Sequence, residues 1–115
     1  FEECFNRYVA AFGDRDLDSI CRHFQSDAVI RIADRDEGLM RVWSPERFYR
    51  ELFERIGSAR FEVDHQNKDL AAGWINVSGR WMKQETCLFQ AADFFMARGS
   101  LIDQLSVVWW GRCEA

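Results

Sequence analysis

The sequence predicts an α+β fold in which helices cover one face of an antiparallel sheet. Two observations carry this prediction. Apolar residues recur at helical spacing in three segments before residue 57, and from Arg60 onward apolar and polar residues alternate with a period of two. The 115-residue chain shows no linker, repeat or low-complexity stretch, so we expect one domain over residues 1–115.

The first predicted helix ends at Gly13, because glycine takes a positive φ without a Cβ clash. A second helix follows at once, and either Asp14 or Asp16 can cap it by accepting its unpaired N–H groups. Ser26 and Asp27 are expected to end this second helix. The apolar stripes of the two helices are Phe1, Phe5, Tyr8, Val9 and Phe12, then Leu17, Ile20, Cys21 and Phe24.

The third predicted helix has the strongest start signal. Ser44 is a capping residue, and Pro45 fits the first helical position because its missing N–H would be unpaired there anyway. Gly57 is expected to close this helix. Its inner stripe is Phe48, Leu52, Phe53 and Ile56.

Six strands are expected. Two short strands, over residues 28–33 and 39–43, flank a charged loop whose run Asp34-Arg35-Asp36-Glu37 is expected to be solvated. Four longer strands form a meander with two-residue turns. These strands cover residues 60–69, 73–83, 86–97 and 100–110, with turns at Ala72-Gly73, Gln84-Glu85 and Arg98-Gly99.

Two-residue turns determine which side chains share a face, because side chains alternate along each strand. The first face is apolar with polar groups set into it, and we expect it to lie under the helices and to line a pocket. Its members are Phe61, Val63, His65, Asn67, Trp74, Asn76, Ser78, Arg80, Met82, Cys87, Phe89, Ala91, Asp93, Phe95, Ile102, Gln104, Ser106, Val108 and Trp110. The predicted ligand contacts among them are Trp74, Asn76, Phe89, Phe95, Gln104 and Trp110.

The second face is almost entirely apolar in its centre. Three helices can cover only one face of a sheet, so we expect this outer face to form a homodimer interface, since monomers rarely expose so large an apolar patch. Its members are Ile75, Val77, Trp81, Leu88, Ala92, Phe94, Met96, Leu101, Leu105, Val107 and Trp109.

Polar side chains of the first face are the candidate catalytic groups. In the predicted register His65 lies opposite Arg80. Asp93 lies between Asn76 and Gln104. Because burial and charged neighbours shift pKa values, such a cluster can do acid–base work, with Asp93 or His65 as the base and Arg80 as the charge partner. A buried ion pair between Arg80 and Asp93 that only orders the sheet fits the pattern equally well.

Tyr8, on the apolar face of the first helix, has two interpretations. A buried tyrosine usually places its hydroxyl on a nearby acceptor and belongs to the core. The alternative is an electrophilic role, in which the hydroxyl donates to a substrate oxygen. Among the histidines, His65 alone is more often a core residue than a base, and His23, next to Arg22, is expected to be solvated.

The composition excludes several classes of function. Hydrophobic residues make up 48% and charged residues 30% of the chain, the balance of a soluble globular protein. The net charge is −4 and no basic run is present, which argues against a nucleic-acid partner. No segment approaches the roughly 20 apolar residues of a membrane span. No phosphate-binding loop, dinucleotide fingerprint, metal signature or nucleophile elbow is present, so no cofactor or metal is expected.

The four cysteines, Cys4, Cys21, Cys87 and Cys113, are scattered without a CxxC spacing. A chain that can bury this much core needs no disulfide framework, so we expect buried free thiols in a cytoplasmic protein. A thiol nucleophile is the weaker alternative.

The segment from Asn6 to Ala28 resembles the opening of the ketosteroid isomerase, SnoaL and nuclear transport factor 2 group. It reads Arg-Tyr-Val-Ala-Ala, then Asp-Leu-Asp, then Phe24 and Asp27-Ala28, and the later Gly-Ser-Leu-Ile and Trp-Trp-Gly fit the same pattern. The resemblance implies a cystatin-like α+β cone, with a curved sheet around a long helix, an apolar cavity and frequent dimers. Members include isomerases, cyclases, dehydratases, epoxide hydrolases and plain binding domains, so the fold alone does not choose a reaction.

Carried over residue by residue, the isomerase pattern is incomplete. Tyr8 matches the tyrosine that donates to the developing oxyanion. Gapless counting from Tyr8 puts Ile32 where the isomerases have their catalytic aspartate, and an alkyl side chain cannot take a proton; Asp34, two residues on, could face the same side. The second isomerase acid belongs near Ala91, one inward position from Asp93. The resemblance therefore argues against steroid isomerase activity.

The leading hypothesis is a homodimer whose cavity binds a small, largely apolar molecule and acts on it as an acid–base lyase, isomerase or hydrolase. The epoxide hydrolases of the group use an Asp–Arg–Asp arrangement, of which Arg80 and Asp93 could supply only part. One alternative is a binding module without catalysis, which is favoured because Ile32 stands where the isomerases have their catalytic aspartate. Another is a structural dimer whose cavity is filled by its own Trp and Phe side chains.

Overall fold

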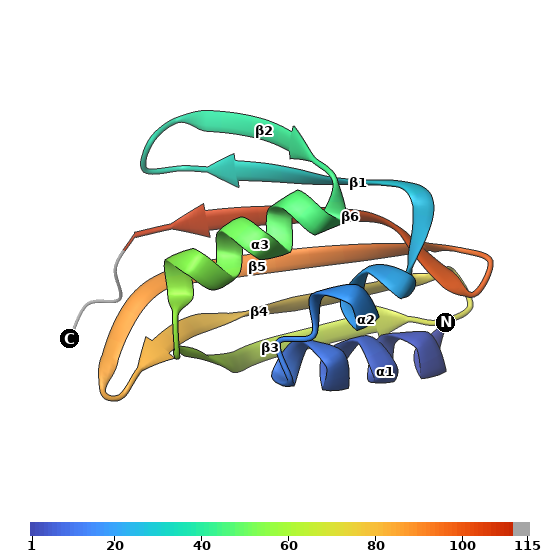
Figure 1. Cartoon of the computed structure of the whole chain (residues 1–115), viewed down its shortest axis with the longest axis horizontal. Coiled ribbons are helices and arrows are strands. Elements are labelled where there is room, and N and C mark those ends of the chain that lie inside the picture. Colours follow the sequence, from blue (N-terminus) through green and yellow to red (C-terminus); the bar gives the residue numbers. More distant parts are fainter. Residues whose placement is uncertain (112–115) are drawn as a thin grey trace.

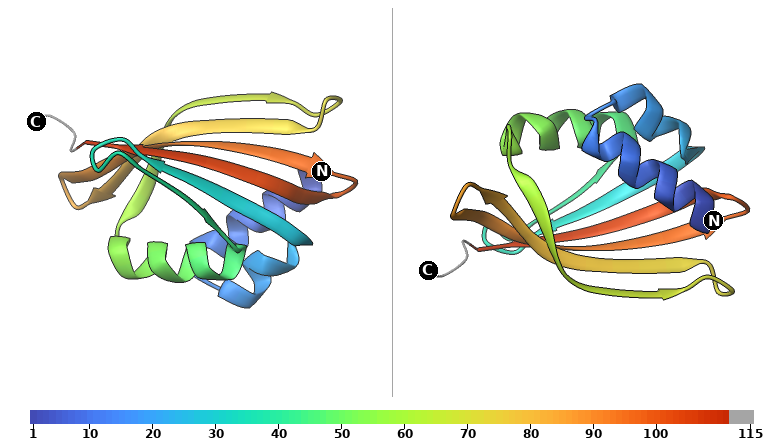
Figure 2. Two further views of the ribbon diagram at one scale, coloured as in Figure 1. Left: turned by 90° about the horizontal axis from the view of Figure 1, so that it is seen from above. Right: turned by 90° about the horizontal axis from the view of Figure 1, so that it is seen from below.

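The computed structural model describes residues 1–111, and in this range three helices lie on one face of a six-stranded sheet (Figure 1). The helices are α1 (Glu2–Gly13), α2 (Leu17–Arg22) and α3 (Pro45–Ile56). The strands are β1 (Phe24–Asp34), β2 (Leu39–Trp43), β3 (Arg60–Asp69), β4 (Trp74–Lys83), β5 (Thr86–Arg98) and β6 (Leu101–Trp110). Figure 2 shows that the sheet curves around the helices, which confirms the predicted α+β class. None of the described helices is long and apolar enough to cross a bilayer.

The strand order is β2-β1-β6-β5-β4-β3, which leaves the sheet open at β2 and β3. The meander β3-β4-β5-β6 is antiparallel throughout, as expected. The first and last strands of the chain are neighbours inside the sheet, where β1 pairs with β6 in parallel. The prediction of a wholly antiparallel sheet is therefore wrong at this one pair.

The helix ends follow the predicted signals with two differences. Asp16 is the cap of α2, since its carboxylate accepts a hydrogen bond of 3.2 Å from the Ser19 amide. α1 does end at Gly13, but the left-handed residue is Arg15, with a φ of 56°. A non-glycine residue in this region is uncommon, because its Cβ crowds the backbone.

α2 is shorter than the sequence indicates, and β1 begins earlier. The carbonyl of His23 accepts a hydrogen bond of 2.9 Å from the Ile102 amide, and Phe24 already pairs with Ile102. Pairing with the last strand therefore ends the helix before Phe24, a long-range effect that local spacing does not reveal. The start of α3 is as predicted, since the Ser44 hydroxyl accepts from the Arg47 amide and Pro45 is the first helical residue.

Three β-bulges in the meander β3-β4-β5-β6 change which residues share a face. The pairings on either side of each bulge show that Asp64 in β3, Leu88 in β5 and Asp103 in β6 are extra residues without a partner of their own. Two turns also differ from the prediction: residues 70–73 and 99–100 form the loops, whereas Gln84-Glu85 is as expected. The two corrected turns shift the strand register by two residues, so each side chain stays on its predicted face. Each bulge shifts the register by one residue, so the side chains beyond it lie on the opposite face from the prediction.

The bulges overturn the predicted faces of β4 and of most of β6. Under the helices lie Phe61, Val63, Gln66, Ile75, Val77, Trp81, Phe89, Ala91, Asp93, Phe95, Ile102, Leu105, Val107 and Trp109. Ile75, Val77, Trp81, Leu105, Val107 and Trp109 were expected on the outer face and are instead buried core. The face turned away from the helices is more mixed, with a stacked pair of rings, Trp74 and Phe94, at 5.7 Å.

Gly79 shows why the first bulge forms where it does. A Cβ atom added to Gly79 would lie 2.0 Å from the carbonyl oxygen of Glu62, so the two backbones approach more closely than any other residue allows. Gly79 pairs with Val63, directly beside the bulge at Asp64. A glycine inside a strand is the sequence signal of such an approach.

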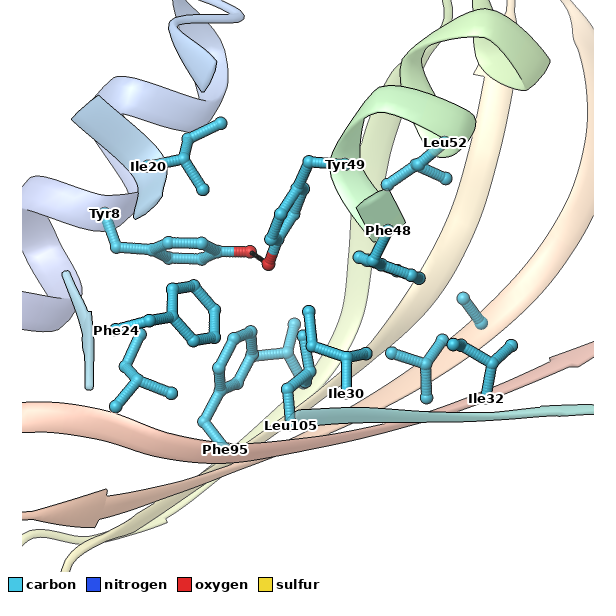
Figure 3. Packing of buried hydrophobic residues seen from close by; sticks show 14 of the residues in the cluster. Tyr8, Ile20, Phe24, Ile30, Ile32, Phe48, Tyr49, Leu52, Phe95 and Leu105 are labelled. Carbon is cyan, nitrogen blue, oxygen red and sulfur yellow. Dashed lines mark hydrogen bonds between the residues drawn. The ribbon is translucent and has the colours of Figure 1, made fainter. Parts of the chain in front are cut away.

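The core fills the space between the helices and the sheet (Figure 3). Ile32 is 1% exposed within it, on the inner face of β1. Asp34, expected in a solvated loop, is buried at the end of β1: it accepts hydrogen bonds of 3.2 Å from the Asp36 and Glu37 amides, and Arg55 lies 3.8 Å away.

The cysteine prediction holds only in part. Cys4 and Cys21 are free, and burial raises the pKa of both thiols. Cys87 is disulfide-bonded, so the expectation of a free thiol is wrong there. Cys113 lies outside the described residues.

Candidate functional site

A cavity of about 610 Å³ lies between α1 and strands β3, β4 and β5. Its walls are mostly apolar and aromatic, as in small-molecule sites. The apolar lining residues include Phe5, Phe12, Phe61, Val77, Trp81 and Phe95. The polar lining residues are Tyr8, Arg15, Ser58, Arg60, Gln66 and Asp93.

Asp93 is the one carboxylic acid on the cavity wall within the described chain. It stands on the inner face of β5, between Val77 of β4 and Val107 of β6. No hydrogen bond or ion pair to Asp93 is formed by residues 1–111. Desolvation in this apolar setting raises the pKa of the Asp93 carboxyl from 3.8 to about 7. Asp93 can therefore hold or release a proton near neutral pH.

Two tyrosine hydroxyls meet beside this carboxyl. The oxygens of Tyr8, from α1, and Tyr49, from α3, are 2.5 Å apart and buried, and Figure 3 shows their rings pointing toward each other. Burial raises the pKa of Tyr8 and of Tyr49, and the negative charge of Asp93 raises both further. Both phenols are therefore protonated over the physiological range, so each can donate a hydrogen bond.

A second, small void of about 20 Å³ is bounded by Tyr8, Tyr49, Asp93, Phe12, Phe48, Leu52, Trp81, Val107 and Trp109. This is about the space of one water molecule. Tyr8 and Asp93 border both spaces. The carboxyl and the tyrosine pair thus share one polar pocket at the inner wall of the larger cavity.

Of the predicted site residues, the structure brings three to the cavity: Asp93, Tyr8 and Phe95. It does not bring His65 or Arg80 there. His65 is exposed and pairs with Ser78, because the bulge at Asp64 reverses its face. Arg80 lies on the outer face and forms ion pairs with Asp64 and Glu62 at 3.2 and 3.7 Å. The predicted cluster of Arg80, Asp93 and His65 is therefore wrong.

The other predicted ligand contacts also lie elsewhere. Trp74 stacks on Phe94 on the outer face. Gln104 accepts a hydrogen bond of 3.4 Å from Arg31, a pairing on the same outer side. Asn76 and Trp110 follow the corrected alternation of β4 and β6 and likewise face away from the helices. Phe89 is on the inner face, but it packs against Trp109 and Arg55 instead of the cavity.

Several site residues escaped the sequence analysis. Trp81 and Val77 were placed on the outer face, and the glycine at Gly79 was the available signal of the bulge that reverses it. Tyr49 directly follows Phe48 of the predicted stripe, but nothing local indicates a hydroxyl partner on α1. Arg15, in the link between α1 and α2, was not singled out by the sequence analysis.

The arrangement offers a proton carrier and hydrogen-bond donors at an apolar wall. A carboxyl with a pKa of about 7 can act as acid or base. When Tyr49 donates to Tyr8, the Tyr8 hydrogen is left for an oxygen in the cavity, the position in which a developing negative charge is stabilised. Within residues 1–111 the chemistry-bearing groups are therefore Asp93, Tyr8 and Tyr49.

No protein-family model matches the chain, and no curated protein matches it. Solved structures do. A nuclear transport factor 2-like protein of unknown function from Burkholderia xenovorans is 13% identical, with a TM-score of 0.70 over 99% of this chain and 85% of that one. A candidate ketosteroid isomerase from Kribbella flavida is 13% identical, with a TM-score of 0.70 over 98% of this chain and 79% of that one. A candidate polyketide cyclase from Sinorhizobium meliloti is 18% identical, with a TM-score of 0.66 over 91% and 93%.

These likenesses show the fold. The chain has the nuclear transport factor 2-like cone fold, in agreement with the resemblance stated for the segment from Asn6 to Ala28. At such low identities they do not transfer a reaction, since unrelated activities share this architecture.

Proposed function

We propose that this cone-fold protein binds a small, largely apolar molecule in the cavity beside α1 and carries out acid–base chemistry on it through Asp93. The observation that carries the proposal is a partly buried carboxyl without a hydrogen-bond donor in residues 1–111, set in apolar walls next to two tyrosine hydroxyls. A strongly shifted carboxyl in a cavity is a frequent sign of a catalytic acid or base.

The simplest step this geometry supports is proton transfer next to a carbonyl. The Asp93 carboxylate takes the proton from a C–H bond, the electron pair of that bond forms a C=C bond, and the carbonyl electrons move onto oxygen. Tyr8 donates a hydrogen bond to that oxygen. Asp93, now a carboxylic acid, returns the proton to the same or another carbon. Isomerases and lyases share this step, and a carboxylate can equally activate water for hydrolysis.

Steroid isomerisation is not part of the proposal. The base of that reaction would stand at Ile32, which is 1% exposed in the core and carries no acid. The cyclase and isomerase descriptions of two structural neighbours fit carbon-acid chemistry in general. They support the reaction class proposed for this chain and no particular substrate.

The test is deuterium exchange into a small apolar ketone. The protein is incubated with 1-tetralone in D₂O, and loss of the α-proton signal is followed by NMR. We expect exchange well above the buffer rate, a loss of about a hundredfold or more in Asp93→Asn, and little change in His65→Ala or Arg80→Met. A ketone that binds and is recovered with its protons unexchanged would select the second candidate, a binding module without catalysis.

We also propose a homodimer formed through the sheet face away from the helices. The support is a group of aromatic and aliphatic side chains on that face, including Trp74, Phe94, Val108 and Met96, the last 42% exposed. A cytoplasmic location is likewise retained as a prediction, to be checked by cell fractionation.

A further inference from the structure

Arg15 borders the proposed ligand cavity. The proton transfer proposed for Asp93 does not use this residue. It lies in the short link between α1 and α2 with a φ of 56°, a conformation that strains a side chain with a Cβ. Its Nη2 donates a hydrogen bond of 2.5 Å to the carbonyl oxygen of Ala59, which joins the link to the start of β3. The backbone and this bond hold the guanidinium at the cavity wall.

The guanidinium is surrounded by aromatic rings. Its Cζ lies 5.7 Å from the ring centre of Phe12, 5.0 Å from that of Phe53 and 5.8 Å from that of Trp81. Each contact favours the cation, but none supplies a negative charge or a strong hydrogen-bond acceptor. The rings fix the position of the group without neutralising it.

No carboxylate of the described chain pairs with Arg15. Its Nη1 is buried and has no hydrogen-bond partner in residues 1–111. The other arginine of the cavity wall, Arg60, does pair, with Glu62 at 3.2 Å. Burial lowers the pKa of the Arg15 guanidinium, the direction expected for a cation short of compensation. An arginine remains charged even so, and a half-buried cation is stabilised by an anion.

We infer that the ligand of this cavity is an apolar molecule carrying one anionic oxygen group, a carboxylate or a sulfonate, and that Arg15 binds that group. The inference rests on the proposed function, since it narrows the class of molecule that the same cavity takes. The Nη1 group, which has no partner in residues 1–111, can donate a charge-assisted hydrogen bond to such an anion, and the aromatic walls take the apolar body.

Two fluorescent probes of the same shape test the inference. 1-Anilinonaphthalene-8-sulfonate carries a sulfonate, and N-phenyl-1-naphthylamine is the same ring system without it. In the wild-type protein we expect the sulfonate to bind about tenfold more tightly or better, the gain of one charge-assisted hydrogen-bonded pair. In Arg15→Met this preference disappears while the neutral probe keeps its affinity within about twofold.

Three further variants test whether the preference for the sulfonate probe is due to Arg15 and whether the probes bind in the cavity. Arg60→Met removes a charge from the same wall and should leave the preference for the sulfonate in place. Arg15→Lys keeps a charge and a similar stem, so it should retain part of the preference, and it serves if Arg15→Met does not fold. Val63→Trp places a large ring at an exposed position of the cavity wall and should weaken both probes, which shows that they bind there.

Failure of the inference about Arg15 and failure of the proposed cavity function give different results. An equal preference for the sulfonate in wild type, Arg15→Met and Arg15→Lys, or no preference in the wild type, would overturn the role of Arg15 while leaving the cavity a ligand site. Binding of neither probe, or binding that Val63→Trp does not weaken, would overturn the proposed cavity function and this inference together.

Discussion

The hydroxyl oxygens of Tyr8 and Tyr49 lie 2.5 Å apart in the interior, and they join α1 to α3 above the sheet. Removing one hydroxyl leaves the other buried without its partner, whereas removing both leaves none unpaired. We therefore expect Tyr8→Phe and Tyr49→Phe each to cost about 1–3 kcal/mol of unfolding free energy, and the double variant to cost less than their sum. Urea unfolding of the four proteins measures this coupling. Strictly additive losses would mean that the two hydroxyls do not depend on each other.

Asp93 makes stability depend on pH in a predictable direction. Near pH 4 the carboxyl is protonated in the folded state, and toward pH 7 the unfolded chain releases this proton while the folded protein keeps it. Because the pKa of Asp93 is 3.8 in the unfolded chain and about 7 in the folded protein, the free energy of unfolding falls by up to about 4 kcal/mol as the pH rises between these values. Above this range Asp93 causes no further fall. Asp93→Asn has no carboxyl to titrate, so its free energy of unfolding should rise relative to that of the wild type as the pH increases. The check is urea unfolding of both proteins at about pH 4.5 and pH 8.

Equal pH slopes for the wild type and Asp93→Asn would contradict this account. The comparison of the two proteins cancels the contributions of the other titrating groups, which both share. His65→Ala is a further control, since His65 is exposed on the other face of β3 and should leave the slope difference unchanged.

Gly79 should tolerate no side chain. A Cβ there would lie 2.0 Å from the Glu62 carbonyl oxygen, so alanine must push two backbones apart. We expect Gly79→Ala to cost on the order of 3 kcal/mol. Gly111→Ala is the matched control, because nothing lies within 4 Å of a Cβ at that position. Thermal unfolding of the two variants measures the difference, and equal midpoints would show that the strands can separate at the bulge.

The sequence predicted the helices and the positions of the strands along the chain well, because both depend on local signals. Ser44 with Pro45 started α3 as expected, and the switch to period two at Arg60 placed the meander. The faces of the sheet failed for a physical reason. A bulge inserts one residue without changing the alternation of residue types nearby. The bulges at Asp64, Leu88 and Asp103 therefore each reversed the assignment of the following side chains to the two faces of the sheet.

The candidate site was predictable to the extent that it sits on elements with strong local signals. Tyr8 follows from the stripe of α1, and Asp93 from a strand whose central face was assigned correctly. Arg80 failed because the bulges at Asp64 and Leu88 separate its face from that of Asp93. Arg15 was missed because a left-handed arginine between two helices has no signature in spacing.

The proposed dimer has a direct test. Phe94 stacks on Trp74 on the face that the helices leave uncovered, so Phe94→Glu should place a charge in the proposed interface. We expect sedimentation at micromolar concentration to show a dimer for the wild type and a monomer for this variant, with the helical signal in circular dichroism unchanged. A monomeric wild type would contradict the proposal.

The central claim is that Asp93 is a partly buried, desolvated carboxyl that exchanges its proton near neutral pH inside a ligand cavity. The most direct measurement is the pH titration of its carboxyl carbon by NMR, with Asp93→Asn used to assign the signal. The account predicts a midpoint near pH 7, the value that desolvation gives this group. A midpoint near pH 4, that of an ordinary solvated aspartate, would contradict it.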